Sequence, residues 1–378
     1  MNKPPKLLYF VTEDWYFCSH RLPLAVAAKQ AGYEVLVVTR VNQHGDLIRA
    51  QGLTLIPLDL SRRSRHPLKE LAVIWQLYKL YRQHQPDIVH HVALKPVLYG
   101  SLAARLAGVR VVVNALAGLG FLFVSQRLQA RVLRPVVELA FRLLLNRTGS
   151  HVIIQNPDDQ ALLVGRKLVA ADRTSLIRGS GVNTQHFAAT PQADGVPLVI
   201  LASRLLWDKG ITEFVAAARN IRALGISARF ALVGVGDPEN PASIADSQLQ
   251  QWHDEGVIEW WGRREDMPRV LAESHIVCLP TTYGEGVPKV LIEAAACARP
   301  IVATDVPGCR EIVRHEDNGL LVPPKDVAAL VRAICRLLAD PDLRQTMGQR
   351  GRDIVNAEFA IGQVLDQTLQ LYQELLKP

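Results

Sequence analysis

Short apolar runs that alternate with helical patterns constrain the fold of this chain more than any other feature of its sequence. Five runs in the first half are almost continuously apolar: KLLYFV, YEVLVVT, DIVHHV, VRVVVNAL and SHVIIQN. Strands that are buried on both faces of a parallel sheet have this composition. The segments between them have helical spacing, as in RLPLAVAAKQAG, PLKELAVIWQLYKLYRQH and VLYGSLAARLAG. This order predicts a doubly wound α/β sheet.

The second half has the same architecture without repeating the sequence. The segment 189–197, ATPQADGVP, is rich in proline, glycine and small residues, and is typical of a linker. Apolar runs resume after it: PLVILAS, ARFALVGVG, VIEWWG, HIVCLPT and PIVATD. A chain of 378 residues also suits two domains better than one. We therefore predict two Rossmann-like domains, 1–188 and 189–358, and a final helix over 359–378 that packs back on the first.

The two halves carry opposite charge. Residues 1–187 contain 24 lysines and arginines against 11 acids, a balance of +13, whereas residues 188–378 contain 19 against 25, a balance of −6. A basic half predicts an anionic surface or partner, either nucleic acid or anionic lipid. Five scattered cysteines without a Cys-x-x-Cys pair favour a reducing compartment. No apolar stretch reaches the length of about 18 residues that spans a membrane, and the first residues do not resemble a signal peptide. The expected location is the cytoplasm.

One acid stands in an otherwise apolar helical segment, YGEGVPKVLIEAAACARP. Glu293 is the only charge between Lys289 and Arg299, and an isolated buried carboxylate is costly. A carboxylate at this depth can accept two hydroxyl hydrogen bonds, as a ribose diol would offer. Pairing with a nearby cation is the plain alternative. Glu285 lies eight positions earlier, in the loop that precedes the helix.

Two cations lie in another loop between a strand and a helix. Arg204 and Lys209 follow the run PLVILAS and precede a helix start. Ligands of doubly wound sheets bind beyond the carboxyl ends of the strands, and helix N-termini favour anions. Gly234 allows close backbone approach after a further strand, and we expect the N–H groups of Gly286 and Val287 beside the same site. Together these residues predict a site for a nucleotide diphosphate.

Five segments carry a family resemblance: SRLLWDKG, LVGVGD, WWGRRED, YGEGVPKVLIEAAACARPIVATDVPGCREIV and NGLLVPPKD. In this order they resemble the retaining GT-B glycosyltransferases of group 1 (family 4), which have a Glu-x7-Glu motif. The resemblance covers essentially the whole chain. It implies a hexosyl- or N-acetylhexosaminyltransferase with two Rossmann-like domains and an active site in the cleft between them.

The resemblance also implies a role for each matching residue. The expected catalytic residues are Glu285, Arg204 and Lys209. The expected donor-binding residues are Arg204, Lys209, Gly234, Gly262, Arg263, Glu285, Gly286, Val287 and Glu293. In such enzymes fixed cations stabilise the departing nucleotide, so neither a metal nor a cofactor is expected. We interpret the Asp-x-Asp of this chain, DPD at 340–342, as a helix boundary.

The first half resembles a bacterial subgroup, the N-acetylhexosaminyltransferases that extend polyprenyl-diphosphate-linked saccharides. The segments that carry this resemblance are WYFCSHRLPLAVAAKQAGYEV, HHVALKPVLYGSLAARLAG and NALAGLGFLF. It implies a UDP-sugar donor, a lipid-linked acceptor and a role in surface polysaccharide or glycan assembly. The chain departs from the wider family where TEDWYFCSHR replaces a glycine pair and where Ala117 replaces a histidine.

Candidate acceptor-binding residues come from the same segments. They are His20, Arg21, His91, Lys95 and Gly118. His20, His91 or Lys95 could compensate for the missing histidine, although a structural role is an equal alternative for each. His90 lies in an apolar run and is expected in the core.

Two basic segments predict contact with a membrane surface. One is SRRSRHPLKE, and the other is QRLQARVLRPVVELAFRLLLNR, whose arginines recur with helical spacing beside a broad apolar face. A solvated helix face over a domain core is the alternative. The residues expected at the membrane are Arg62, Arg63, Arg65, Arg127, Arg131 and Arg134. The protein would then be attached peripherally to the inner face of the cell membrane.

Three other functions remain open. The acceptor could be soluble. A UDP-sugar 2-epimerase-like enzyme would share the fold but should lack the combination of SRLLWDKG with EGVPKVLIE. A non-enzymatic anion-binding module would explain the basic half but leaves the two glutamates without a role. No nucleic-acid partner is expected, since no RNA- or DNA-binding motif is present.

Overall fold

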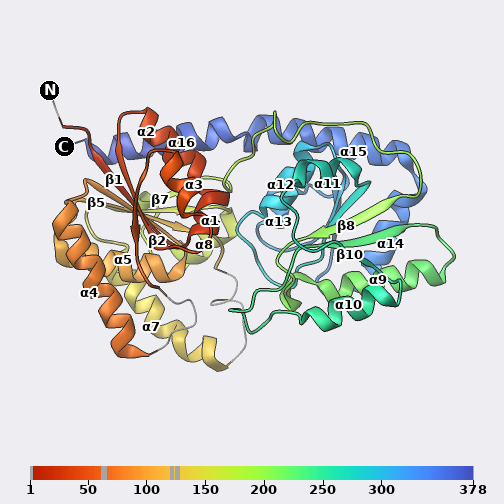
Figure 1. Ribbon diagram of the computed structural model, residues 1–378, viewed down its shortest axis with the longest axis horizontal. Coiled ribbons are helices and arrows are strands. Elements are labelled where there is room, and N and C mark those ends of the chain that lie inside the picture. Colours follow the sequence, from red (N-terminus) through yellow and green to blue (C-terminus); the bar gives the residue numbers. More distant parts are fainter. Residues whose placement is uncertain (1–2, 61–65, 120–122, 124–127, 378) are drawn as a thin grey trace. The chain divides into compact units, whose positions relative to one another are not determined.

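The computed structural model describes residues 3–60, 66–119, 123 and 128–377. The chain divides into two compact units, which are Met1–Ser180 with Gly362–Pro378 (unit 1) and Gly181–Ile361 (unit 2). The division precedes the segment 189–197, in which the sequence analysis placed the boundary. Both units are α/β, with helices packed on a parallel sheet, so the expected fold class is confirmed (Figure 1).

Unit 1 is built on a seven-stranded parallel sheet in the order β3-β2-β1-β4-β5-β6-β7. The strands are β1 (Lys6–Glu13), β2 (Glu34–Arg40), β3 (Thr54–Pro57), β4 (Ile88–Val92), β5 (Val111–Leu116), β6 (Ser150–Ile154) and β7 (Thr174–Leu176). Strands β4, β5 and β6 are buried at every residue, which explains their continuously apolar sequences. The strand order reverses between β1 and β4, so the segments that follow these two strands lie at a topological switch point.

The helices of unit 1 are α1 (Asp14–His20), α2 (Leu22–Gln30), α3 (Gly45–Ala50), α4 (Pro67–His84), α5 (Leu94–Ala107), α7 (Leu128–Leu144), α8 (Pro157–Gly165) and α16 (Ile361–Leu376). Helix α1 lies within TEDWYFCSHR, a segment for which the sequence analysis predicted no helix. The fully buried carboxylate of Asp14 explains it. This carboxylate accepts hydrogen bonds from the backbone N–H groups of Trp15, Asn42 and His44, at 2.7–2.8 Å. It therefore joins the start of α1 to the loop after β2.

The C-terminal helix α16 belongs to unit 1. Tyr372 of α16 is fully buried, and its hydroxyl lies 3.1 Å from the hydroxyl of Tyr9 in β1. The same hydroxyl contacts Nδ1 of His90 in β4. Val364 and Leu371 extend the contact into the core on this face of the sheet. His90 is therefore part of the core, as expected.

Unit 2 contains a six-stranded parallel sheet in the order β10-β9-β8-β11-β12-β13. The strands are β8 (Leu198–Ala202), β9 (Arg229–Val233), β10 (Glu259–Trp260), β11 (Ile276–Leu279), β12 (Ile301–Thr304) and β13 (Gly319–Val322). The helices are α9 (Ile211–Ala223), α10 (Asp246–Asp254), α11 (Met267–Glu273), α12 (Lys289–Ala296), α13 (Cys309–Ile312), α14 (Val327–Ala339) and α15 (Pro341–Ile354). Asp340 caps α15 by accepting a hydrogen bond from the N–H of Leu343, so its motif does mark a helix boundary.

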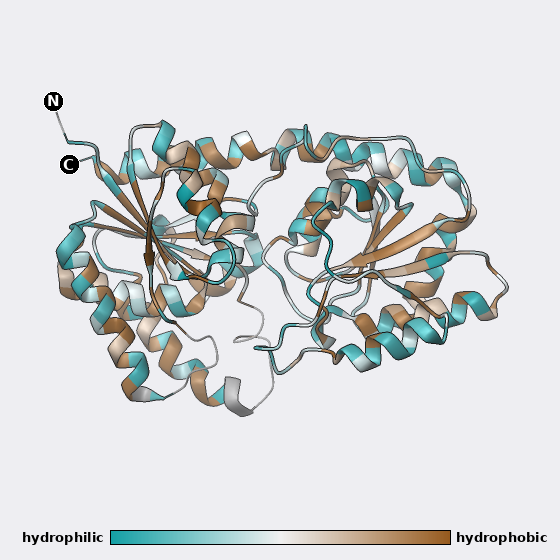
Figure 2. Cartoon of the chain, viewed as in Figure 1, coloured by the Kyte–Doolittle hydropathy of each residue, from teal (hydrophilic) through white to brown (hydrophobic). Residues whose placement is uncertain are grey.

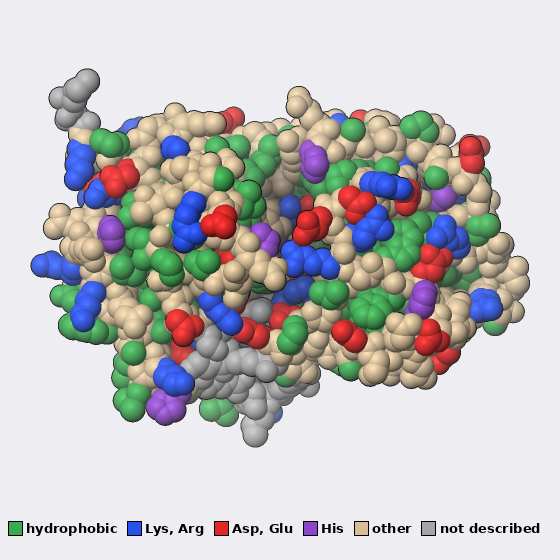
Figure 3. Space-filling view, viewed as in Figure 1, with side chains coloured by type: hydrophobic (Ala, Val, Ile, Leu, Met, Phe, Trp, Pro, Cys, Tyr) green, Lys and Arg blue, Asp and Glu red, His purple; other side chains and the backbone are tan. Residues whose placement is uncertain are grey.

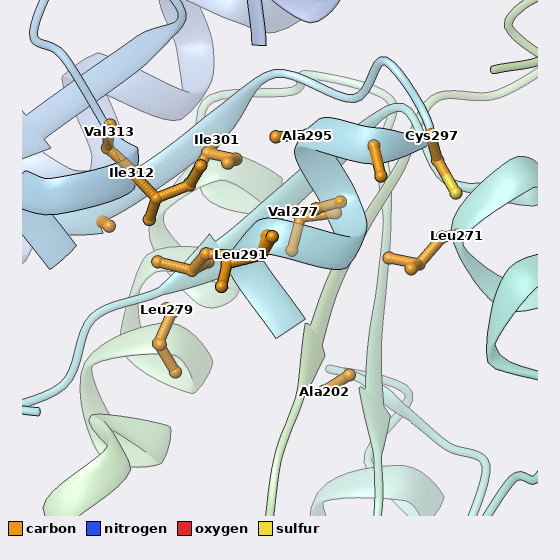
Figure 4. Close-up of a cluster of buried hydrophobic side chains, with 14 of the residues drawn as sticks. Ala202, Leu271, Val277, Leu279, Leu291, Ala295, Cys297, Ile301, Ile312 and Val313 are labelled. Carbon is orange, nitrogen blue, oxygen red and sulfur yellow. The ribbon is translucent and has the colours of Figure 1, made fainter. Parts of the chain in front are cut away.

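Helix α12 lies in the core of unit 2. Leu291 points from α12 toward Val277 of β11, within a cluster that also includes Ala295 and Ile301 (Figure 4). Most strands of both units are largely hydrophobic, whereas most helices have hydrophobic and hydrophilic faces (Figure 2). The core therefore holds α12 against β11 and β12. Glu293 lies on this helix.

Candidate active site

The loop after β8 is held close to the end of β11 by a glycine. Gly210 has φ +75°, and a Cβ atom there would lie 1.9 Å from the carbonyl oxygen of Pro280. No side chain fits in that space. The glycine also begins α9, so Lys209 precedes a helix N-terminus, where partial positive charge favours an anion.

Lys209 forms an ion pair with Glu285, which lies in the loop between β11 and α12. The two side chains are only 12 % and 15 % exposed. Burial lowers the pKa of Lys209, but the charge of Glu285 and of Tyr283 and the hydrogen bond to Glu285 outweigh it, so the pKa is raised overall. Lys209 therefore keeps its positive charge at physiological pH. The structure brings together two of the three expected catalytic residues.

Arg204 forms a separate ion pair. Its guanidinium lies 2.9 Å from the carboxylate of Asp237, which follows β9 and is largely buried. The N–H of Asp237 in turn donates to the hydroxyl of Ser243 at 2.8 Å. Asp237 was missed by the sequence analysis, although its position directly after LVGVG, at the carboxyl end of a strand, was the available signal.

Two of the expected donor-binding glycines are in direct contact. The N–H of Gly234 donates to the carbonyl of Gly262 at 2.7 Å. Both residues have positive φ, and a Cβ atom on Gly234 would lie 2.0 Å from the carbonyl oxygen of Ser203. The glycine thus allows the segments after β8, β9 and β10 to approach each other. Arg263 is about half exposed and lies 3.8 Å from Glu265.

The segment that contains Glu285, Gly286 and Val287 packs on a tight turn after β12. Gly308 has φ +83°, and a Cβ atom there would lie 1.7 Å from the carbonyl oxygen of Gly286. The N–H of Glu285 donates to the carbonyl of Pro307 at 3.0 Å. The backbone path around Glu285 therefore depends on the absence of a side chain at position 308.

Glu293 is 7 % exposed and pairs with Lys289 at 3.1 Å, one turn earlier in α12. Burial raises the pKa of Glu293, although Lys289 and the charge of His186 act in the opposite direction. Pairing of Glu293 with a nearby cation, the alternative named in the sequence analysis, is thus present in the structure. The ion pair with Lys289 does not offset the whole cost of burying the Glu293 carboxylate, because the pKa of Glu293 remains raised.

Two of the expected acceptor-binding residues of unit 1 have partners within the protein. Both ring nitrogens of His91 are bonded inside the core, to the hydroxyl of Tyr81 at 3.0 Å and to the side-chain oxygen of Asn114 at 2.9 Å. His91 is fully buried, so it belongs to the core and is not placed to bind an acceptor. Lys95 pairs with Glu70 at 3.1 Å.

Of the other three residues, His20 ends α1, Arg21 follows it, and Gly118 follows β5. The ring of His20 stacks on Tyr16, with 4.2 Å between centroids. Arg21 follows α1 and is 5 % exposed. Gly118 has φ +92°, and the backbone of the next residue, Leu119, is hydrogen-bonded to Asp159 of α8. Of the residues expected at a membrane, Arg62, Arg63, Arg65 and Arg127 lie outside the described residues, and Arg131 and Arg134 lie on α7.

Two family models match this chain, one in each unit. Residues 6–156 match the glycosyl transferase 4-like family, and residues 196–340 match the glycosyl transferases group 1 family. The second match includes Arg204, Lys209, Glu285 and Glu293. The chain is a glycosyltransferase with a 4-like domain and a group 1 domain.

Curated relatives of this glycosyltransferase act on lipid-linked sugars according to their names. One is the N,N'-diacetylbacillosaminyl-diphospho-undecaprenol alpha-1,3-N-acetylgalactosaminyltransferase of Campylobacter jejuni, which is 27% identical over 94% of this chain and 95% of its own length. Another is the UDP-Gal:alpha-D-GlcNAc-diphosphoundecaprenol alpha-1,3-galactosyltransferase of Escherichia coli, which is 26% identical over 82% of this chain and 81% of its own.

Solved structures share the fold of this glycosyltransferase. Sucrose-phosphate synthase from Thermosynechococcus elongatus superposes with a TM-score of 0.79 at 23% identity, covering 98% of this chain and 99% of that one. The Anabaena protein HepE, solved in complex with UDP and glucose, superposes with a TM-score of 0.80 at 19% identity, covering 98% and 100%. The expected GT-B fold is confirmed. Within the described part of the chain, no three histidine, cysteine or acidic side chains are placed to hold a metal ion together.

Proposed function

We propose that this glycosyltransferase moves a hexose or N-acetylhexosamine, with retention of configuration, from a UDP-sugar to a polyprenyl-diphosphate-linked saccharide. The observation that carries the proposal is the buried Lys209–Glu285 pair at the N-terminus of α9, with Arg204 on the same loop as Lys209. A departing nucleotide diphosphate is an anion, and preorganised cations stabilise it without solvent reorganisation. The names of the relatives from Campylobacter jejuni and Escherichia coli support the donor and acceptor classes.

Each donor-site residue has a distinct task in this proposal. Lys209 and Arg204 bind the diphosphate and neutralise the charge that develops on it. Glu285 holds the Lys209 ammonium and faces the donor sugar. Glu293 accepts hydrogen bonds from the ribose hydroxyls, which offset the cost that its raised pKa reveals. The backbone near Gly262 and Arg263 contacts the base. Because fixed cations perform the electrostatic work, the proposed reaction needs no metal.

An apolar row on α7 supports attachment of unit 1 to a membrane surface. Val132, Val136, Leu139 and Leu143 recur with helical spacing, and at least half of each is exposed. The opposite face of α7 contributes Val137 and Phe141 to the core, together with Leu145 directly after the helix. A merely solvated face would carry polar side chains instead. The exposed apolar row therefore favours the membrane interpretation over the solvated one, and Arg131 and Arg134 lie on the same helix.

Helix α4 adds a second exposed apolar row that the sequence analysis did not identify. Leu68, Leu71 and Trp75 lie on one face of α4 and are all more than half exposed. Lys79 lies over the Trp75 ring, 5.4 Å from its centroid. On the face shown in Figure 3, hydrophobic side chains reach the surface over α4, with lysine and arginine side chains beside them. No helix in the described residues is long and apolar enough to cross a membrane. We propose peripheral attachment at the inner face of the cell membrane.

The proposed function is tested by offering the purified protein a panel of UDP-sugars together with lipid extract or a synthetic polyprenyl-diphosphate saccharide. We expect transfer of one sugar to the lipid-linked acceptor, with the anomeric configuration of the donor retained in the product by NMR. If sugar is transferred only to water-soluble saccharides, the acceptor is a soluble saccharide and not a lipid-linked one. Conversion of the UDP-sugar to its 2-epimer without transfer would contradict the proposal.

A further inference from the structure

Thr281 lies between the loops that carry Lys209 and Glu285. It is fully buried two residues after the end of β11. Its hydroxyl lies 3.1 Å from Oε1 of Glu285 and 3.1 Å from the carbonyl oxygen of Asp208, the residue that precedes Lys209. A hydroxyl carries one proton, so the two acceptors share it. One side chain thus contacts the Glu285 carboxylate and the backbone directly before Lys209.

The same residue is connected to the next strand of the sheet. The hydroxyl of Thr304, at the end of β12, donates to the carbonyl of Thr281 at 2.6 Å. Strands β8, β11 and β12 are neighbours in the sheet. Hydrogen bonds therefore join the carboxyl ends of three adjacent strands, and Thr281 is the middle link.

A purely structural role would require Thr281 to satisfy the carbonyl of Asp208. That carbonyl already accepts hydrogen bonds from the N–H of Thr282 at 2.9 Å and from the hydroxyl of Thr282 at 3.2 Å. Its need for a further donor is small. Thr281 and Thr282 both contact the Asp208 carbonyl, but Thr281 also contacts the Glu285 carboxylate.

The geometry of this contact restricts the carboxylate. Lys209 and Thr281 both donate to the same oxygen of Glu285, Oε1. Two donors at one oxygen, from different directions, limit the rotation of the carboxylate and fix the position of the ammonium group. A side chain locked by such contacts is what a reacting site needs, since a small displacement of a catalytic group is costly.

We propose that Thr281 is a positioning residue, which holds the Glu285 carboxylate and the Lys209 ammonium in one arrangement for transfer. The consequence for catalysis rests on the proposed function, whereas the consequence for the pair itself does not. Removing the hydroxyl should loosen the pair without removing a group that touches the nucleotide.

The experiment compares Thr281→Val, which keeps the shape and removes the hydroxyl, with Thr281→Ser, which keeps the hydroxyl. Thr282→Val is the matched comparison, because its hydroxyl contacts only the Asp208 carbonyl. The first measurement is the rate at which an amine-reactive acetylating reagent labels Lys209, read by mass spectrometry against exposed Lys325. We expect labelling of Lys209 to rise at least threefold in Thr281→Val and to stay near the parent rate in Thr281→Ser and Thr282→Val.

The second measurement separates turnover from binding. We expect Thr281→Val to lower kcat by about tenfold, the scale of one hydrogen bond to a charged group, with the Kd for UDP within twofold of the parent. Parent-like labelling of Lys209 in Thr281→Val would overturn the inference, as would equal effects of Thr282→Val. A parent protein that transfers no sugar would overturn the proposed function alone, because the labelling result does not depend on turnover.

Discussion

Lys209 and Glu285 form an ion pair across the carboxyl ends of two neighbouring strands, although 76 residues separate them in the sequence. Both side chains are mostly buried, and the pair raises the pKa of Lys209 despite the burial. The ammonium therefore has a fixed position and a fixed charge before any nucleotide binds. In the proposed reaction, Lys209 would serve as the counter-ion of the diphosphate without reorganisation of the loop.

The two cations of the β8 loop should be required for turnover. We expect Arg204→Ala and Lys209→Ala each to lower the rate of the chemical step by roughly 10²–10³, because each removes a preorganised charge from a developing anion. Single-turnover kinetics with the UDP-sugar would measure this. Arg269→Ala is the control, since it breaks an exposed ion pair of unit 2. The assignment fails if both variants stay within threefold of the parent.

Replacing Glu293 with glutamine should weaken nucleotide binding and stabilise the folded protein. Glu293→Gln should weaken nucleotide binding by about 1–3 kcal/mol, the scale of a hydrogen bond to a charged group, as measured by calorimetry. The same change should stabilise the ligand-free protein at neutral pH. Burial raises the pKa of this group in the folded state, so its ionisation costs stability as pH rises through the folded pKa.

Thermal unfolding without nucleotide would check the stability effect, with the gain expected at pH 7 and absent at acid pH. Glu285→Gln is the contrasting variant, because it should lower turnover more than nucleotide affinity. Equal nucleotide affinity for the parent and Glu293→Gln would refute the ribose assignment.

Transfer should not depend on a metal ion. Activity in excess EDTA should remain near that of the untreated protein, since Lys209, Arg204 and the N-terminus of α9 supply the positive charge. Initial rates with and without EDTA, and after addition of Mn²⁺, would measure this. Loss of activity with EDTA and its return with Mn²⁺ would show that the charge assignment is incomplete.

Unit 1 should bind anionic membranes reversibly. Each basic residue near an anionic leaflet contributes about 1 kcal/mol, and salt screens the attraction. We expect the protein to sediment with anionic vesicles at low salt and to be partly released at high salt. Replacing Arg127, Arg131 and Arg134 with glutamate should reduce both sedimentation and turnover of a lipid acceptor, and should largely spare a short water-soluble acceptor.

The apolar row of α7 gives an independent variant of the same experiment. Val132→Ser combined with Val136→Ser and Leu139→Ser should weaken vesicle binding even at low salt, because the loss is not electrostatic. Leu224→Ser is the control, since Leu224 is equally exposed but lies in unit 2. Undiminished vesicle binding by the arginine variant, or no binding by the parent, would favour a soluble acceptor.

His91 should remain neutral in mildly acidic solution. Burial lowers its pKa to about 4, although the hydrogen bond to Asn114 acts in the opposite direction. The folded protein therefore loses up to about 3 kcal/mol of stability on acidification relative to one with an ordinary histidine. This loss is absent above pH 6.5 and grows as pH falls toward 4, because the unfolded chain then binds a proton that the folded chain does not.

Histidine NMR signals followed from pH 7 to 4 would test this directly. The ring of His91 should titrate only near the acid end of this range. Titration of His91 near pH 6.5 would contradict the buried network with Tyr81 and Asn114.

The sequence by itself determined the fold class and the type of chemistry. A run such as VVVNAL has no polar side that could face water, so it requires a parallel sheet covered on both faces. The charges of Arg204, Lys209 and Glu285 in loops after strands indicated where an anion could bind, because the carboxyl ends of parallel strands share one edge. These inferences use local composition and order, which the sequence carries directly.

The tertiary structure alone decided which of these residues meet. Lys209 could have paired with either glutamate, and only the packing of Gly210 against Pro280 and the turn at Gly308 place it beside Glu285. His91 was a candidate ligand until both of its nitrogens proved to be bonded inside the core. A hydrogen bond over such a separation depends on side-chain directions that no local pattern encodes. That is the physical reason why Thr281 could be recognised only in the folded chain.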